Sequence, residues 1–261
     1  MISDIFSAAK AARAEVARLS DDRRNDILLR LADAIGENAD AILAANSLDY
    51  AGMDESNPMR DRLLLTPSRL EGIASDMRNV ASLPSPLGRV LSEKTMPNGL
   101  EIKRVSVPFG VIGVIYEARP NVTFDVFSLC FKSGSVCVLK GGRDAESSNR
   151  AIEAVIRKVL AENGVTQNAV NLLPSSHEAA GELLGAVGYV DVLIPRGGRR
   201  LIDFVRDNAK VPCIETGAGV VNTYFDKAAD LQKGIAIVVN AKTRRVSVCN
   251  ALDCLIIHAG R

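Results

Sequence analysis

The sequence contains no tryptophan and few aromatic residues of any kind. Aromatic residues make up 4% of its 261 residues, whereas apolar residues together make up 47%. We therefore expect a core built from alanine, valine, leucine and isoleucine. A chain of this length and composition can bury a sizeable core, as ordinary globular proteins do.

Neither sign of charge is in excess. Lysine and arginine total 32 against 31 acidic residues, which gives a net charge of +1. Proteins that bind nucleic acid or anionic membranes through electrostatics carry a basic excess. No apolar run approaches the roughly 20 residues that span a bilayer. We therefore expect neither nucleic acid nor a membrane as a partner.

Cysteine and histidine are scarce, and their spacing fits neither disulfides nor metal ligands. The five cysteines form no C-x-x-C pair, which indicates a reducing compartment rather than a disulfide framework. His177 begins His-Glu-Ala-Ala-Gly, which breaks the H-E-x-x-H zinc motif. The first ten residues lack the basic and apolar regions of a secretory signal. We expect a cytoplasmic protein without a metal.

The N-terminal third is predicted to be helical. Apolar residues recur at helical spacing over residues 5–19, 27–35 and 41–48. Ser68 and Glu71 are spaced as a capping box ahead of a further helix.

Residues 89–107 have a different pattern. Two partly alternating runs flank Pro97-Asn98-Gly99, and Asn-Gly between alternating runs is a strong hairpin signal. Because the runs are polar and carry Lys and Arg, we expect an arm rather than part of the core.

From Gly110 onward, short apolar runs alternate with helical stretches. This order is typical of βαβ units and of an open, mostly parallel sheet with flanking helices, an α/β fold. The expected strands are residues 110–116, 135–139, 170–173, 190–194 and 212–214. The expected helices between them are residues 124–132, 147–163, 178–185 and 199–208. A helix over residues 226–243, with Asp226 as its N-cap, and a strand over residues 251–257 should follow.

Polar and glycine-rich segments follow three of these strands. They are Tyr-Glu-Ala-Arg-Pro-Asn-Val-Thr at 116–123, Lys-Gly-Gly-Arg at 140–143 and Pro-Arg-Gly-Gly-Arg-Arg at 195–200. The carboxyl ends of strands in an α/β sheet are where ligands bind. Gly-Gly lets the backbone approach a ligand, and Lys, Arg and a helix N-terminus favour phosphate. No standard Rossmann loop or P-loop motif is present.

One cysteine lies in a polar, cationic segment, residues 240–250. Cys249 has Lys242, Arg244 and Arg245 nearby in the sequence. Cationic surroundings lower a thiol pKa and favour the nucleophilic thiolate. The other four cysteines lie in apolar stretches and are expected to be small buried residues: Cys130, Cys137, Cys213 and Cys254.

Residues 107–123, 138–143 and 240–250 together resemble the motifs of γ-glutamyl phosphate reductases, within the aldehyde dehydrogenase superfamily. The motifs occur in the family's order, and the resemblance extends over essentially the whole chain. It implies an aldehyde-dehydrogenase-like fold in which the hairpin is an oligomerisation arm. It also implies an NADP-binding domain at residues 1–239 and the start of an α/β catalytic domain at residues 240–261. Family members are longer, so we expect a C-terminally truncated chain.

The resemblance implies an activity and two catalytic residues. The family reduces L-glutamate 5-phosphate to L-glutamate 5-semialdehyde with NADPH and releases phosphate, a step of proline biosynthesis. Cys249 would form a thioester with the substrate, and Asn121 would donate to the developing oxyanion. The resemblance further implies a homo-oligomer in the full-length form and glutamate 5-kinase as a candidate partner.

Five residues are implied to bind the cofactor. Lys140 would hold the adenosine ribose, with Gly141 next to it, and Arg143 would meet the 2′-phosphate that distinguishes NADPH from NADH. Gly197 and Gly198 would lie along the cofactor.

Two other functions remain open. A hydrolytic aldehyde dehydrogenase would use Glu215 as a general base and would act on free aldehydes without phosphate. Phosphate is the leaving group in the biosynthetic reaction, so we assign Glu215 no role there. A non-catalytic fragment would bind NADPH without turnover. Arg119 could contact phosphate or pair with Glu117, and the sequence does not decide between these roles.

Overall fold

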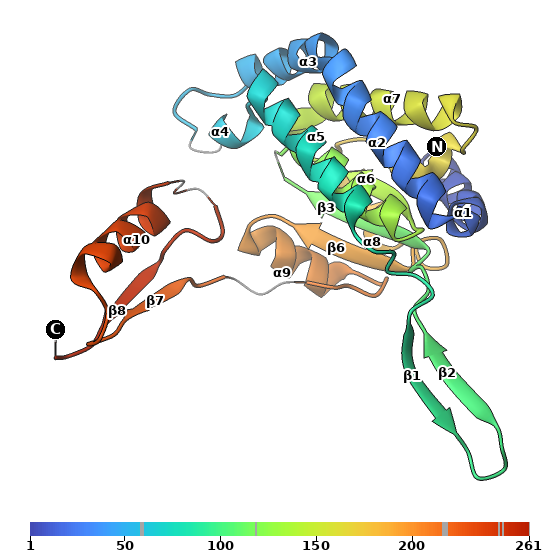
Figure 1. Cartoon of the computed structure of the whole chain (residues 1–261). Helices are drawn as coiled ribbons and strands as arrows, with labels where there is room; N and C mark the ends of the chain where they lie inside the picture. Colours follow the sequence, from blue (N-terminus) through green and yellow to red (C-terminus); the bar gives the residue numbers. More distant parts are fainter. Residues whose placement is uncertain (58–59, 118, 216–218, 245, 247, 261) are drawn as a thin grey trace. The chain divides into compact units, whose positions relative to one another are not determined.

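The computed structural model divides the chain after Glu215 into a first unit, Met1–Glu215, and a second unit, Thr216–Arg261 (Figure 1). The structure describes residues 1–57, 60–117, 119–215, 219–244, 246 and 248–260. Each unit has a parallel sheet of its own.

Four parallel strands form the sheet of the first unit: β3 (Val111–Tyr116), β4 (Val136–Lys140), β5 (Val170–Leu172) and β6 (Val192–Arg196). Their order is β5-β4-β3-β6, and every neighbouring pair is parallel. All residues of β3 and β4 are buried, which explains why these strands read as continuous apolar runs. The predicted α/β fold is confirmed.

The strand predicted at residues 212–214 is reduced to a single bridge between Leu193 and Cys213. Pro212 has no N–H to donate to a neighbouring strand, so a longer ladder is disfavoured here. The backbone still makes two bonds with β6, from Leu193 N to Pro212 O and from Ile214 N to Leu193 O.

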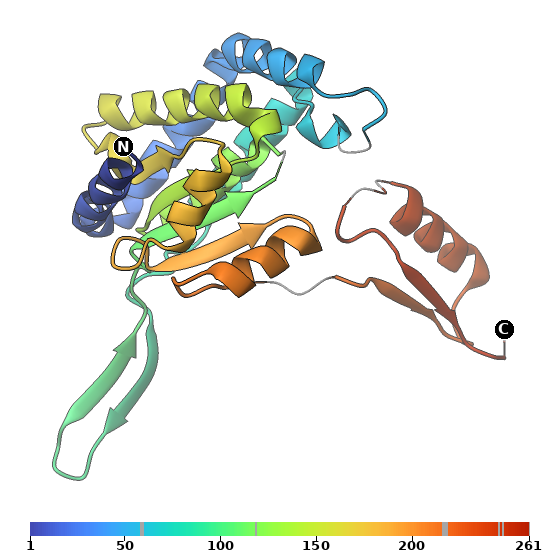
Figure 2. The same ribbon diagram turned by 180° about the vertical axis from the view of Figure 1, so that it is seen from behind.

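Helices connect the strands and cover the sheet. They are α6 (Asn121–Lys132), α7 (Glu146–Glu162), α8 (His177–Leu184) and α9 (Arg199–Asn208), with short 3₁₀ turns at Arg143–Ala145 and Gln167–Ala169. Each of these four α-helices begins and ends within three residues of the helix predicted for it. The N-terminal helices pack onto α6 and α7, and Figure 2 shows α3 beside α7.

The N-terminal helices are α1 (Ile2–Arg18), α2 (Asp21–Glu37), α3 (Ala39–Gly52), the short α4 (Arg60–Leu63) and α5 (Pro67–Ser82). The prediction of a capping box at Ser68 and Glu71 is wrong. Thr66 is the N-cap of α5, and its hydroxyl accepts from the Arg69 N–H at 3.2 Å. Pro67 then occupies the first helical position, where its fixed φ suits the helix.

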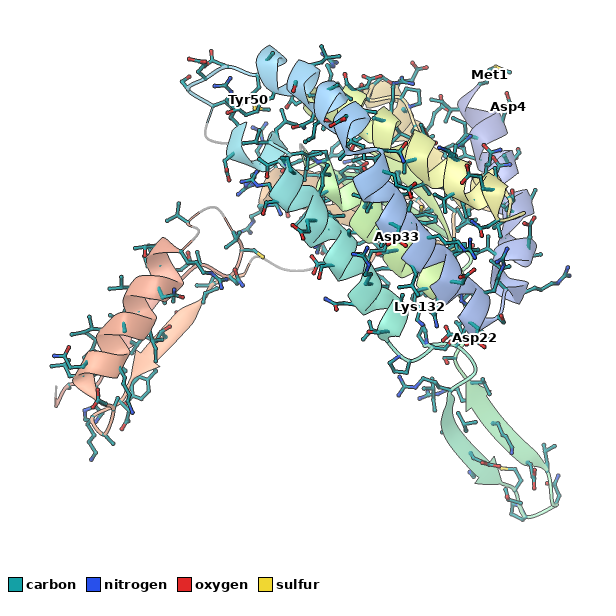
Figure 3. All side chains as sticks on the ribbon, turned by 45° about the horizontal axis from the view of Figure 1, so that its top comes forward. Met1, Asp4, Asp22, Asp33, Tyr50 and Lys132 are labelled. Carbon is teal, nitrogen blue, oxygen red and sulfur yellow. The ribbon has the colours of Figure 1, made fainter. Side chains whose placement is uncertain are left out.

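A buried lysine ties the N-terminal helices to α6. The side chain of Lys132 is labelled in Figure 3. Its Nζ lies 3.1 Å from Asp21 Oδ1 and donates to Asn25 Oδ1 at 2.6 Å, and both partners are on α2. Burial, the largest single influence, would raise the pKa of Asp21, but the hydrogen bonds from Lys132 and Asn25 and the charges of Lys132 and Arg24 together outweigh it, and the pKa is lowered. This contact fixes the position of α6, which carries Asn121.

The hairpin predicted over residues 89–107 is confirmed as β1 (Val90–Thr95) and β2 (Glu101–Val105). Every residue of both strands is exposed, and the hairpin projects from the body of the first unit (Figure 1). Glu93 and Lys103 lie opposite each other and form a 2.7 Å ion pair. Gly99 supplies the positive φ, +82°, that the turn requires. The hairpin's role in oligomerisation stays a prediction.

The second unit is a βαβ unit: β7 (Asn222–Phe225), α10 (Leu231–Thr243) and β8 (Cys254–Ile257), with β7 parallel to β8. The helix begins later than predicted. Asp230 is its N-cap, whereas Asp226 accepts from the Ala228 N–H in the preceding turn. Because β7 pairs with β8, residues 222–225 belong to the second unit. The NADP-binding domain boundary near residue 239 stays a prediction.

None of the helices in the described part of the chain combines the length and the apolar character of a membrane-spanning segment.

Candidate active site and cofactor site

The three predicted ligand segments begin at neighbouring strand ends. Tyr116, Lys140 and Arg196 are the last residues of β3, β4 and β6. In the central strand β3, Ile115 is paired with Lys140, and Tyr116 is paired with Arg196. The polar segments therefore leave the sheet side by side at its carboxyl edge, where α/β proteins bind ligands.

Lys140 is a buried cation at this edge. Its ammonium donates to the Ser175 carbonyl at 3.2 Å. Burial, and to a lesser degree the neighbouring Arg143 guanidinium, lowers the pKa of Lys140. Two adjacent cations, one of them buried, create an electrostatic cost that an anionic ligand would relieve.

Gly141 is required by close packing. A Cβ atom at this position would collide with the side-chain nitrogen of Asn149 and would lie 3.2 Å from the Tyr116 hydroxyl. A cavity of about 200 Å³ adjoins this turn. It is lined by the turns after β4 and β5 and by the start of α7, including Gly141, Gly142, Glu146, Asn149 and Ser175. This volume is below the roughly 300–1,000 Å³ of typical ligand pockets, so it suits only part of a larger ligand.

Gly197 and Gly198 form the N-terminal approach to α9, and a carboxylate already lies there. The Gly198 N–H donates to Glu117 Oε2 at 3.0 Å, and a Cβ atom on Gly197 would lie 2.8 Å from Glu117 Cδ. The first turn of α9 contains Arg199 and Arg200 but no acidic residue. Glu117 thus supplies the negative charge that a helix N-terminus favours. The sequence indicated an anion site here but did not identify Glu117 as its occupant.

Asn121 is the first residue of α6, and Pro120 is the N-cap. The side chain of Asn121 does not cap the helix. Its Nδ2 atom donates to Asp125 Oδ2, one turn later, at 2.9 Å. Burial raises the pKa of Asp125 to about 6, against the opposing effect of the Asn121 hydrogen bond. Sequence reasoning missed Asp125, although its i, i+4 spacing from Asn121 is a visible signal.

A buried polar network lies beneath the site. The Tyr116 hydroxyl and Thr123 Oγ1 are 2.7 Å apart, and Thr123 donates to Asn149 Oδ1 at 2.8 Å. Because Thr123 gives its proton to Asn149, Tyr116 must be the donor to Thr123. Burial raises the pKa of Tyr116 far above its ordinary value, so it remains a phenol. The network joins β3, α6 and α7 beside Gly141.

Cys249 lies in the second unit, exposed, in a turn between α10 and β8. Lys242 donates to the Leu252 carbonyl at 2.8 Å, Arg244 is exposed, and Arg245 lies outside the described residues. Activation of the thiol by these cations therefore stays a prediction. The five predicted cofactor residues and Asn121 lie in the first unit, whereas Cys249 lies in the second.

The remaining four cysteines differ in burial. Cys130 and Cys137 are buried as expected. The prediction of a buried residue is wrong for Cys254, which is exposed on β8, and only partly met by Cys213, which is half-buried. Glu215 Oε1 lies 3.8 Å from Arg206 Nη1. Within the described residues, no group of three or more His, Cys, Asp or Glu side chains could hold a metal ion.

Comparisons with known proteins identify the family of the chain. The aldehyde dehydrogenase family model matches residues 1–261. The γ-glutamyl phosphate reductase of Bacteroides thetaiotaomicron is 60% identical over 260 residues, which are 100% of this chain and 62% of that protein. The one from Chlorobium chlorochromatii is 58% identical over 261 residues, with the same two coverages. The chain therefore spans about three-fifths of the length of these curated relatives.

Solved structures support the same fold. The crystal structure of γ-glutamyl phosphate reductase from Thermotoga maritima superposes with a TM-score of 0.89 at 35% identity, covering 99% of this chain and 64% of that one. An acetylating aldehyde dehydrogenase from Geobacillus thermoglucosidasius, at 15% identity and a TM-score of 0.73, covers 99% of this chain and 55% of that one, and shares the fold alone. Similar over its whole length to γ-glutamyl phosphate reductases, the chain belongs to the aldehyde dehydrogenase family.

Proposed function

We propose that this chain carries the cofactor site and the reactive cysteine of an enzyme of proline biosynthesis. The enzyme reduces L-glutamate 5-phosphate to L-glutamate 5-semialdehyde with NADPH and releases phosphate. One observation carries the proposal: Asn121, Lys140 and Gly197-Gly198 lie at or after three neighbouring strand ends in a chain 60% identical to a curated γ-glutamyl phosphate reductase.

The first unit fits a phosphorylated dinucleotide. Lys140 and Arg143 provide two adjacent cations, and a cavity of about 200 Å³ opens beside Gly141. Arg143 is exposed and available to a 2′-phosphate, which favours NADPH over NADH. Gly197 and Gly198 lie at the start of α9, where the Gly198 N–H now bonded to Glu117 would donate to the cofactor's diphosphate in its place.

The reaction needs a nucleophile and an oxyanion donor. The Cys249 thiolate attacks the acyl phosphate carbon, a carbon–sulfur bond forms, and phosphate leaves with the electrons of the broken carbon–oxygen bond. The Asn121 amide donates to the oxygen that becomes negative, an interaction worth about 3 kcal/mol in other enzymes. When bound, NADPH supplies the hydride that converts the thioester to the aldehyde and releases the Cys249 thiolate.

The proposal is tested in reverse, as NADP⁺ reduction by the chain with glutamate 5-semialdehyde and phosphate. Cys249→Ala is compared with Cys254→Ala, because both thiols are exposed in the second unit. We expect phosphate-dependent turnover that is lost in Cys249→Ala and kept in Cys254→Ala. Turnover without phosphate that depends on Glu215 would instead indicate a hydrolytic aldehyde dehydrogenase.

A second candidate function is cofactor binding without turnover. All five predicted cofactor residues lie in the first unit, whereas Cys249 lies in the second, which makes cofactor binding by the first unit alone chemically feasible. NADPH binding, measured by fluorescence, without any turnover would favour this candidate.

The finer biological setting is also a proposal. Five free thiols suit the reducing cytoplasm. The exposed hairpin β1–β2 has unpaired strand edges, which suit pairing with a second copy in the full-length form. Glutamate 5-kinase is the proposed source of the labile acyl phosphate.

A further inference from the structure

The first two turns of α6 hold a side-chain pair that the proposed reaction does not yet use. Asn121 Nδ2 donates to Asp125 Oδ2 at 2.9 Å. Asparagine at a helix start usually caps the helix, but here Pro120 is the N-cap, so the Asn121 side chain does not have that role. Its amide orientation is therefore set by Asp125.

Asp125 faces a small cavity between α5 and α6, of about 210 Å³. Apolar side chains line most of this space, among them Met77, Phe124 and Leu129, and Asp76 of α5 is the other carboxylate on its wall. Four influences act on the charge of Asp125. The Asn121 hydrogen bond and the Arg196 guanidinium at the end of β6 stabilise its charge, whereas burial and Asp76 oppose it.

We propose that Asp125 is a positioning residue that fixes which way the Asn121 amide points and so presents its second N–H to the substrate oxygen. The inference rests on the proposed function, because it assigns Asn121 the oxyanion role. An ionised carboxylate can only accept hydrogen bonds, so it holds the amide nitrogen and excludes the amide oxygen. One N–H is occupied by Asp125, and the other remains to donate to the oxyanion.

Protonation of Asp125 removes this constraint. A neutral carboxyl carries an O–H that can donate to the amide oxygen, so the amide can turn over and withdraw its N–H groups. The pKa of about 6 places this change within the range of ordinary assays. Asn121 should therefore be a competent donor above pH 6 and progressively less so below it.

Nuclear magnetic resonance tests the coupling directly on this chain. In a ¹⁵N-labelled sample, the side-chain amide signal of Asn121, identified by its loss in Asn121→Ala, is followed between pH 5 and pH 8. We expect one transition with a midpoint near 6, moved to lower pH in Asp76→Asn and absent in Asp125→Asn. An Asn121 signal that does not respond to pH, or the same transition in Asp125→Asn, would overturn the inference.

Kinetics of the reverse reaction test the consequence. At pH 7.5 we expect Asp125→Asn to lower kcat by at least about 10-fold, with an unchanged KM for NADP⁺, and Asp125→Glu to retain more activity. In an Asn121→Ala background, Asp125→Asn should change kcat by less than about 2-fold, because it acts through the missing amide. Additive losses, or full activity in Asp125→Asn, would contradict the positioning role.

The two failures are distinguishable. If the wild-type chain gives no phosphate-dependent turnover, the proposed function fails for this chain, and the resonance of Asn121 still decides whether Asp125 orients it. If the wild type turns over and Asp125→Asn is indistinguishable from it, the function stands and the positioning role is wrong.

Discussion

The two units differ most in how many of their residues are buried. In the first unit every residue of β3 and β4 is buried, and one continuous core joins the sheet to α1, α2 and α5–α8. In the described part of the second unit only Ala251 and Leu252 are buried, no residue of α10 is, and every residue of β8 is exposed. The proposed cofactor site therefore rests on a packed core, whereas Cys249 rests on a βαβ unit with almost none.

This difference matters for the proposed reaction. Asn121 is held by Asp125, Lys140 by the Ser175 carbonyl and Gly141 by close packing, so each of these contacts lies within the first unit. Within the described residues of the second unit, the turn around Cys249 is held by backbone bonds of its neighbours, such as Ala251 N to Val248 O and Leu252 N to Ala241 O. We expect local unfolding to be far easier around Cys249 than around Asn121.

The largest expected effect is on hydrogen exchange. Backbone amides of β8 and α10 should exchange at least about 1000-fold faster than those of β3 and β4, because they can open without disrupting a core. Exchange followed by mass spectrometry on the intact chain measures both regions in one sample. Equal protection of the two units would contradict a difference in their local stability.

Lys132→Ala should destabilise the first unit by about 3 kcal/mol, because it leaves Asp21 and Asn25 on α2 without their buried partner. Chemical denaturation measures the loss, and Lys158→Ala, an exposed lysine of α7, is the control. The pKa of Asp21 is lowered by folding, so its contribution is present at neutral pH and is lost as the pH falls through that lowered value. A loss confined to the second unit would contradict this assignment.

Gly141→Ala should cost about 2 kcal/mol of stability and weaken NADPH binding, because the added methyl group meets Asn149 and Tyr116. Gly72→Ala on α5 is a matched control. Nothing lies within 4 Å of its Cβ position, so this helical substitution should stabilise by about 1 kcal/mol. Thermal denaturation and a cofactor titration distinguish the two variants. Unchanged cofactor affinity in Gly141→Ala would place the cofactor elsewhere.

Glu117→Gln should have the smallest effect, a cost of about 0.5 kcal/mol from the lost charge at the start of α9. It should also tighten NADPH binding a few-fold, since the carboxylate no longer competes with the cofactor's diphosphate. Glu178→Gln in the first turn of α8 is the control and should leave cofactor binding unchanged. Weaker binding in Glu117→Gln would mean that Glu117 assists the cofactor rather than competing with it.

Much of the fold was predictable from local patterns, and the errors have local causes too. The strands β3 and β4 are buried on both faces, so their sequences are continuous apolar runs that stand out. Strand β7, Asn-Thr-Tyr-Phe, is short and half-exposed and gives no such signal. At α5, Thr66 followed by Pro67 outcompetes the Ser68–Glu71 spacing as the helix start.

The site was predictable as a set of residues but not as a set of contacts. Strand ends and glycines identified residues 140–143 and 195–200 because the carboxyl edge of a parallel sheet is fixed by topology. Glu117 reaches Gly198 across 81 positions in the sequence, and Thr123 reaches Asn149 across 26. Contacts of this kind depend on tertiary packing, which spacing along the chain does not specify.

The most direct test of the proposed chemistry is the intact mass of the chain after incubation with glutamate 5-semialdehyde and NADP⁺ in the absence of phosphate. We predict the addition of one glutamyl group, located on Cys249, released on adding phosphate, absent from Cys249→Ala and retained in Cys254→Ala. No adduct in the wild type, or an adduct that persists in Cys249→Ala, would contradict the assignment of Cys249 as the nucleophile.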